Sequence, residues 1–126
     1  MNLAVLGASD KPDRYSHKAC LLLREKGHRV FPVHPTLSAI EGMPVYPALS
    51  AVPERIDILT MYVSAENSAG LTGEILKKPP RAIVFNPGAE NPSLAAAAEK
   101  AGIRTLEACT LVLLRTGQFD RVLSGA

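Results

Sequence analysis

The sequence has little of several features that mark particular classes of protein. Of its 126 residues, two are cysteine, none is tryptophan, and the formal net charge is only +2. Cys20 and Cys109 stand alone, without a C-x-x-C spacing, so we expect free thiols of a reducing compartment rather than a disulfide or a zinc site. The near balance of charge gives no reason to expect nucleic-acid binding.

Long apolar runs are also missing. No stretch approaches the roughly 20 apolar residues that span a bilayer, and the apolar run at residues 3–6 is too short, and uncharged at its front, for a signal peptide. We therefore expect a cytoplasmic protein with no membrane segment. The length fits one compact domain, residues 1–126, and is too small for a two-domain dehydrogenase.

Five short apolar runs predict the strands of a sheet. Most of them are nearly continuous in hydrophobicity, which is typical of parallel strands that are buried on both faces. The runs are residues 2–7, 29–33, 57–63, 82–86 and 104–107.

The stretches between these runs predict helices. The first has an apolar face and ends before Gly27, a residue typical of the position just past a helix end. Asn91 as a cap and Pro92 in the first turn mark another. A weaker helix contains two glycines, each of which costs about 1 kcal/mol relative to alanine. The predicted helices are residues 16–26, 65–76 and 93–101, with a last one from about Thr110.

The connection over residues 34–56 is long and rich in proline. Its one extended piece, residues 44–46, is predicted as a short edge strand, where proline is tolerated. The whole pattern predicts an α/β fold: a three-layer, doubly wound, mostly parallel Rossmann-like sheet of six strands in the order 3-2-1-4-5-6. Ligands bind such sheets at the carboxyl ends of the strands, where the order reverses between the first and fourth strands.

The first strand ends in a glycine turn that suits phosphate. Gly7 lets a ligand approach the backbone, and the unpaired N–H groups of the next helix attract negative charge. We expect Gly7→Val to weaken binding more than folding, because its side chain would take the space of a diphosphate. The alternative is a solvated turn with a serine cap. The candidate contacts are Gly7, Ala8, Ser9, Lys11, Arg14, Ser16 and Lys18.

This turn is not a complete dinucleotide fingerprint. Ser9 and Pro12 stand where G-x-G-x-x-G has its second and third glycines. An NAD site also needs an aspartate or glutamate at the end of the second strand, where this chain has Val33, His34 and Pro35. His34 either faces a ribose or an added phosphate, or is a surface histidine without a ligand. NAD is thus disfavoured.

Two further strand ends lie at the same predicted edge. Polar residues follow both strands, and a glycine follows the second, so we expect ligand contacts there; for the second segment the alternative is a tight strand-to-helix turn. The candidates are Tyr62, Val63, Ser64, Asn86, Pro87 and Gly88, with Glu90 close by.

The sequence shows no catalytic set. No carboxylate pair, metal-ligand cluster or nucleophile motif stands out. Cys109, beside a predicted helix start, is an activated thiol or, more often in such a place, a buried structural cysteine. His17 has no serine or cysteine placed to make it a catalytic base.

Together these motifs resemble the small stand-alone CoA-binding proteins, which are similar to the CoA-binding domain of the succinyl-CoA synthetase alpha subunit. The departures are His34 for the usual asparagine, Asn86 where glutamine is commoner, and Ala108 for an arginine. The matching segments are residues 7–12, Arg14-Tyr15-Ser16-His17, Val33-His34-Pro35, Ile40-Glu41-Gly42, Val45-Tyr46, Ile56-Asp57, residues 85–90 and Ala108-Cys109.

The resemblance implies that coenzyme A or an acyl-CoA lies across the carboxyl edge. Its diphosphate would lie over residues 7–9 and the helix at Ser16, near Tyr15, and its adenosine toward residues 33–36 and 62–64. The chain has no room for the synthetase's second domain, so that reaction is not transferred. The expected partner is a small molecule, and a homo-oligomer is compatible with this reading. The alternatives are a nucleotide- or NAD(P)-dependent enzyme and a regulatory or scaffolding domain with a vestigial pocket.

Overall fold

The protein is built around a parallel five-stranded sheet. The computed structural model describes residues 1–124, and neighbouring strands of the sheet all pair in parallel in the order β2-β1-β5-β6-β7. The predicted Rossmann-like α/β fold is confirmed, with the order reversing between β1 and β5. The strands are β1 (Asn2–Leu6), β2 (Arg29–Val33), β5 (Ile58–Met61), β6 (Ala82–Phe85) and β7 (Arg104–Glu107).

The predicted sixth strand is wrong. Tyr46 makes a single bridge to Val33, in which the Tyr46 N–H donates to the Pro32 carbonyl at 2.9 Å. Residues before it form a small antiparallel hairpin of β3 (Ala39–Ile40) and β4 (Met43–Pro44). Proline has no N–H to donate, so Pro44, two residues before the bridging Tyr46, cannot extend the pairing with β2.

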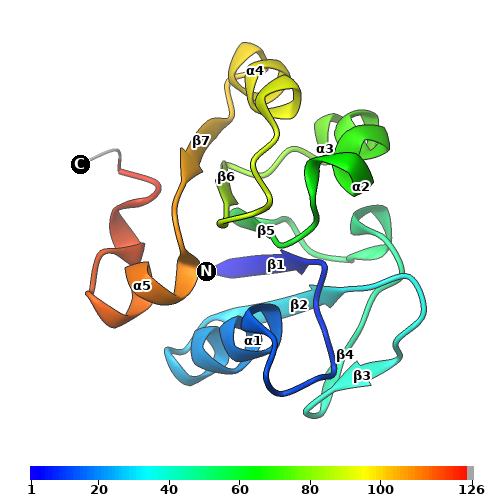
Figure 1. The fold of residues 1–126 in the computed structure, drawn as a ribbon, viewed down its shortest axis with the longest axis vertical. Helices are drawn as coiled ribbons and strands as arrows, with labels where there is room; N and C mark the ends of the chain where they lie inside the picture. The colour runs from blue at the N-terminus through cyan, green and yellow to red at the C-terminus, as the bar shows by residue number, and fades with distance from the viewer. Residues whose placement is uncertain (125–126) are drawn as a thin grey trace.

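Helices cover both faces of the sheet (Figure 1). On one face lie α1 (Tyr15–Glu25) and α5 (Thr110–Arg115), and on the other lie α2 (Ala65–Ser68), α3 (Thr72–Lys77) and α4 (Pro92–Lys100). The single helix predicted over residues 65–76 is interrupted by a 3-10 turn, η2 (Ala69–Leu71), which contains Gly70. Two more 3-10 turns are η1 (Leu49–Ala51) and η3 (Phe119–Arg121).

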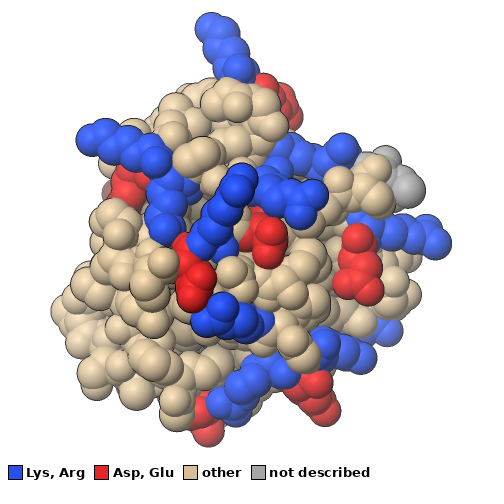
Figure 2. Space-filling view, turned by 180° about the vertical axis from the view of Figure 1, so that it is seen from behind, with Lys and Arg blue, Asp and Glu red and all other residues tan. Residues whose placement is uncertain are grey.

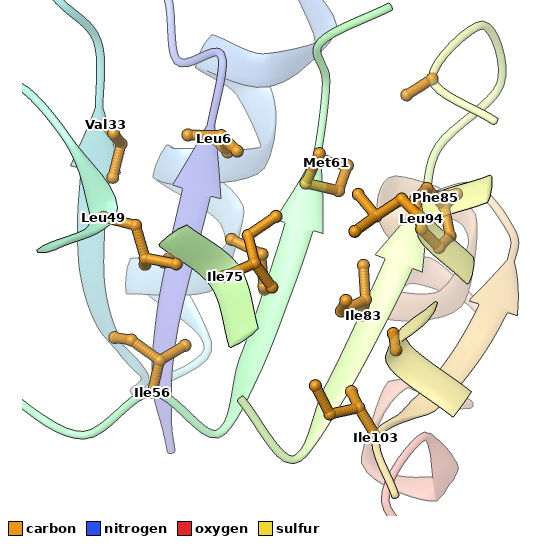
Figure 3. Close-up of a cluster of buried hydrophobic side chains, with 14 of the residues drawn as sticks. Leu6, Val33, Leu49, Ile56, Met61, Ile75, Ile83, Phe85, Leu94 and Ile103 are labelled. Carbon is orange, nitrogen blue, oxygen red and sulfur yellow. The ribbon is translucent and has the colours of Figure 1, made fainter. Parts of the chain in front are cut away.

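Each face of the sheet has its own apolar core. Figure 3 shows the core under α3 and α4, where Met61 and Phe85 from the strands lie near Ile75 and Leu94 from the helices. Burying each such side chain contributes about 1.5–3 kcal/mol. The strand β7, at one edge of the sheet, is mostly exposed, contrary to the predicted burial on both faces.

Candidate functional site

A cleft of about 650 Å³ opens at the carboxyl ends of β1, β2 and β5. Its walls come from the loop after β1, the start of α1, the turn after β2 and the segment after β5. The sheet order reverses here, which is where open α/β sheets bind ligands. The lining residues are Gly7, Ala8, Ser9, Asp10, Lys11, Arg14, Tyr15, Ser16, His34, Leu37, Tyr62, Val63, Ser64, Asn67 and Pro87.

Most of the predicted site residues lie in this cleft. The structure also places Asp10, Leu37 and Asn67 there, which the sequence analysis did not select. Asp10 could have been predicted from the sequence, because it lies between the selected residues Ser9 and Lys11. Leu37 and Asn67 could not, because the turns that follow β2 and β5 bring them to the cleft. The predicted residues that do not line the cleft are Lys18, Val33, Pro35, Asn86 and Gly88.

The backbone of the loop after β1 is pinned at its beginning. The N–H groups of Gly7 and Ala8 both donate to the Val33 carbonyl, each at 3.2 Å. Val33 therefore serves the site through its main chain, by fixing the end of β1 against β2. These two N–H groups are already used, which leaves the N–H groups of the following helix as the donors predicted for a phosphate.

The start of α1 provides donors that are not used. The helix has 11 residues, and Arg14 at its N-cap makes no side-chain capping bond. Within residues 1–124, the N–H groups of Tyr15, Ser16 and His17 have no hydrogen-bond acceptor. Uncapped N–H groups and the positive end of the helix dipole attract anions. Lys11 and Arg14, which line the same cleft, add positive charge.

Gly7 has a different role from the one expected. Its φ is +90°, and a Cβ built there would lie 2.9 Å from Val63 Cγ2 and 3.1 Å from the Tyr62 carbonyl carbon. A side chain at this position would therefore collide with the segment after β5 before it could fill the diphosphate space. We therefore expect Gly7→Val to weaken folding as well as binding, because the glycine allows two chain segments to approach closely.

His34 organises the turn after β2. Its Nδ1 accepts the backbone N–H of Thr36 at 3.1 Å and that of Leu37 at 3.2 Å. Because Nδ1 accepts, the proton of the neutral ring is on Nε2. His34 thus lines the cleft with one N–H donor and holds Leu37 at the cleft wall.

Asn86 lies in the interior and not in the cleft. The side chain is 1% exposed. Its Nδ2 donates to Thr60 Oγ1 at 2.7 Å and to the Met61 carbonyl at 2.8 Å, and its Oδ1 accepts the Thr110 N–H at 2.8 Å. The amide joins β5, β6 and α5. The predicted direct contact of Asn86 with a ligand has no support in this geometry.

Glu90 and Gly88 close the turn after β6. The Glu90 carboxylate accepts the Gly88 N–H at 2.9 Å. Asn91 then caps α4 by accepting the Leu94 N–H at 3.1 Å, as predicted, and donates to Ser68 Oγ at 2.8 Å. Of this segment only Pro87 reaches the cleft.

The side chains of Cys20 and Tyr62 are shielded from solvent, which changes their pKa values. Burial raises the pKa of Cys20 to about 12, and the nearby Arg24 lowers it by less. Burial is also the main reason that the pKa of Tyr62 lies well above its ordinary value of 10.0, with Cys109 contributing next. Both side chains therefore stay protonated at neutral pH. Cys109 is free and half-buried at the N-cap of α5.

Two further features, a metal-binding cluster and a membrane-spanning helix, are absent from the part of the chain that the structure describes. Among residues 1–124, no group of three His, Cys, Asp or Glu side chains is placed to hold a metal ion. None of the helices in that range is both long and apolar enough to cross a membrane. On the face opposite to that of Figure 1, acidic side chains lie among the basic ones (Figure 2).

Comparison with known proteins gives the family. The model of the family described as CoA binding domain matches residues 1–115. The chain belongs to this family. A relative in Bacillus subtilis (strain 168), the uncharacterized protein YneT, is 32% identical over 75 residues, which are 60% of this chain. The match spans little more than half, 56%, of that relative's length.

Solved structures share the fold. A protein from Thermus thermophilus, cell-free ID.343, is 30% identical with a TM-score of 0.85, over 94% of this chain and 90% of that one. The dinucleotide-forming acetyl-coenzyme A synthetase 1 of Ca. Korarchaeum cryptofilum, in complex with phosphate and ADP, is 26% identical with a TM-score of 0.73. That match covers 85% of this chain and only 25% of the synthetase.

Proposed function

We propose that this protein binds coenzyme A or an acyl-CoA in the cleft at the carboxyl edge and catalyses no reaction by itself. The observation that carries the proposal is the uncapped start of α1. Its free N–H groups open into a cleft of about 650 Å³ that also contains Lys11 and Arg14. Membership in the CoA binding domain family supports the choice of ligand.

The chemistry of the walls suits the parts of coenzyme A in a definite order. The diphosphate would lie against Ser9, Asp10 and the first turn of α1, where N–H donors and the helix dipole favour an anion. The adenosine would lie between the His34 turn and the segment that follows β5. Tyr62 and Leu37 give this half apolar surface, and His34 gives it an N–H donor.

Catalysis by this chain alone has no support from the relatives. The synthetase contains this fold as a quarter of its length. A shared fold does not carry the chemistry of the other domains with it. The cleft itself holds one carboxylate, that of Asp10, among its lining residues, and no nucleophile paired with a base.

Calorimetry of ligand-stripped protein tests the proposal. We expect saturable heat with coenzyme A and with acetyl-CoA, and weaker or no heat with NAD and NADP, since the second strand ends in His34 and not in an acid. A thermal-shift panel of the same compounds should rank them in the same order, because a ligand of the native state raises the melting temperature. No coenzyme A binding up to millimolar concentration would overturn the proposal, and stabilisation by NAD(P) alone would favour a dinucleotide-dependent enzyme.

A further inference from the structure

His17 lies behind the loop that leads from β1 to α1. It belongs to the first turn of α1 and is 2% exposed. Its Nδ1 lies 2.9 Å from the Ser9 carbonyl oxygen. A carbonyl can only accept, so Nδ1 carries a proton and donates it. This bond closes the loop between Ser9 and the helix.

The bond to Ser9 fixes the orientation of one peptide group. In a trans peptide the C=O and the N–H of the same unit point in opposite directions, and no peptide of the described residues is cis. With the Ser9 carbonyl turned toward buried His17, the Asp10 N–H points to the other side of the loop. That N–H has no acceptor within residues 1–124, and Asp10 lines the cleft.

The other ring nitrogen of His17 faces the β3–β4 hairpin. Nε2 is buried, makes no hydrogen bond within residues 1–124, and lies 3.5 Å from the Glu41 carboxylate. The Glu41 carbonyl in turn accepts a hydrogen bond from Arg24 Nη1 of α1 at 2.7 Å. The hairpin is thus fastened to α1 directly beside His17.

Glu41 occupies a backbone position that its residue type disfavours. Its φ is +48° and that of Gly42 is +79°, and together they connect paired Ile40 and Met43. Such two-residue turns prefer asparagine, aspartate or glycine first. A residue that breaks a local preference indicates a role elsewhere, and the Glu41 carboxylate beside His17 gives that role a location.

We propose that His17 is a positioning residue for the phosphate loop, braced by Glu41, which keeps the Asp10 N–H turned toward a bound phosphate. The inference rests on the proposed function, since the phosphate is that of coenzyme A. Without the His17 bond, the Ser9–Asp10 peptide is free to rotate. Its carbonyl would then face the anion and repel it.

Two substitutions at His17 test the roles of its two ring nitrogens separately. In His17→Asn the side-chain amide places an N–H near the position of Nδ1, whereas in His17→Gln the amide reaches the position of Nε2. We expect coenzyme A affinity within about threefold of wild type for His17→Asn and about tenfold weaker for His17→Gln, the usual size of one lost hydrogen bond. ADP, which carries the diphosphate, should follow the same order.

The outcomes separate this inference from the proposed function. If wild type binds no coenzyme A, the proposed function fails. If wild type binds and the two variants lose affinity equally, or neither loses any, the positioning role of His17 is wrong. Melting temperatures without ligand, measured on the same samples, show whether the variants fold.

Glu41→Asn gives a second, independent test that does not alter α1. Asparagine suits the turn, so we expect a melting temperature equal to or above that of wild type. Affinity for coenzyme A should still fall by about threefold, because the shorter side chain loses its contact with His17 Nε2. Unchanged affinity in this variant would remove Glu41 from the proposal. Glu41→Gln, which keeps the length and removes the charge, is the matched control and should keep affinity near that of wild type, because its amide can donate to Nε2 of the neutral ring.

Discussion

The helices α1 and α4 both begin at the carboxyl edge of the sheet, and they differ in how their first N–H groups are used. In α4 the Asn91 side chain accepts the Leu94 N–H, and Pro92 has no N–H. In α1 the N-cap residue Arg14 makes no capping bond, and the first N–H groups have no acceptor within residues 1–124.

This difference separates a structural turn from a binding loop. Both segments follow a buried strand, and both contain a glycine with positive φ, Gly7 and Gly88. After β6 the N–H groups of Gly88 and Leu94 donate to the side chains of Glu90 and Asn91, and only Pro87 of this segment reaches the cleft. After β1 several donors remain open toward the cleft. Unused donors on residues that line the cleft, and not the presence of glycine, distinguish the two.

The largest expected effect contrasts the two glycines. Gly7→Ala combines a positive φ with a Cβ 2.9 Å from Val63 Cγ2, so we expect about 3 kcal/mol of lost stability. Gly88→Ala has the same φ penalty but open space around the new Cβ, which predicts about 1 kcal/mol. Urea unfolding of both variants measures the difference. Equal losses would show that close approach at Gly7 has no energetic importance.

The cap of α4 gives the next effect. Asn91→Ala removes the acceptor for the Leu94 N–H and the donor to Ser68 Oγ, so we expect about 2 kcal/mol of lost stability. Affinity for coenzyme A should stay unchanged, because this turn does not bind the ligand. Asn91→Asp keeps the capping acceptor and should recover part of the stability. If Asn91→Ala folds normally but binds coenzyme A more weakly, the claim that only the start of α1 binds the ligand is wrong.

Capping α1 should have opposite effects on stability and binding. Arg14 has φ −78° and ψ 141°, the conformation of an N-cap, so Arg14→Asp should add about 0.5–1 kcal/mol of stability. The same carboxylate would compete with phosphate for the helix N–H groups and repel it. Arg14→Gln, which removes the charge without adding a strong cap, is the control and should weaken coenzyme A binding less. Calorimetry and thermal unfolding together test this; tighter binding by Arg14→Asp would contradict it.

The smallest effect concerns the two cysteines, which again contrast a closed and an open position. Burial raises the pKa of Cys20 from 9.0 to about 12, so between these values the unfolded chain loses a proton that the folded chain keeps. The contribution of Cys20 is complete below pH 9 and falls as the pH rises toward 12. We expect Cys20→Ala to reduce this decline in unfolding free energy, and Cys109→Ser to leave it in place. An identical pH profile for wild type and Cys20→Ala would argue against burial of the thiol.

Local signals allowed much of the fold to be predicted from the sequence. The structure confirms the strands predicted from the apolar runs at β1, β2 and β6 and the helix start predicted from Asn91-Pro92. Each of these predictions rests on residues that are adjacent in the sequence. The strand predicted at residues 44–46 was wrong, because pairing there depends on which N–H groups of this segment reach the carbonyl groups of β2 in space. The helix predicted over residues 65–76 was interrupted near Gly70, where helix propensity is low.

The candidate site was predictable as a place but not in its detailed roles. The sheet topology locates the edge, so most candidates lie in one cleft. The role of Asn86 could not be seen, since its partners Thr60 and Thr110 come from other elements. Gly7 was assigned to the ligand for the same reason: its contact with Val63 exists only after β1 and β5 pair.

Amide NMR during a coenzyme A titration tests the central claim most directly. The account predicts saturable shifts of the amide signals of Ser9, Asp10 and residues 15–17, whose N–H groups are open, while the signals of residues 88–94 change little. The size of the shifts should follow the calorimetric affinity in wild type and in Arg14→Asp. Saturable shifts centred on residues 88–94, with the first loop unchanged, would contradict the account.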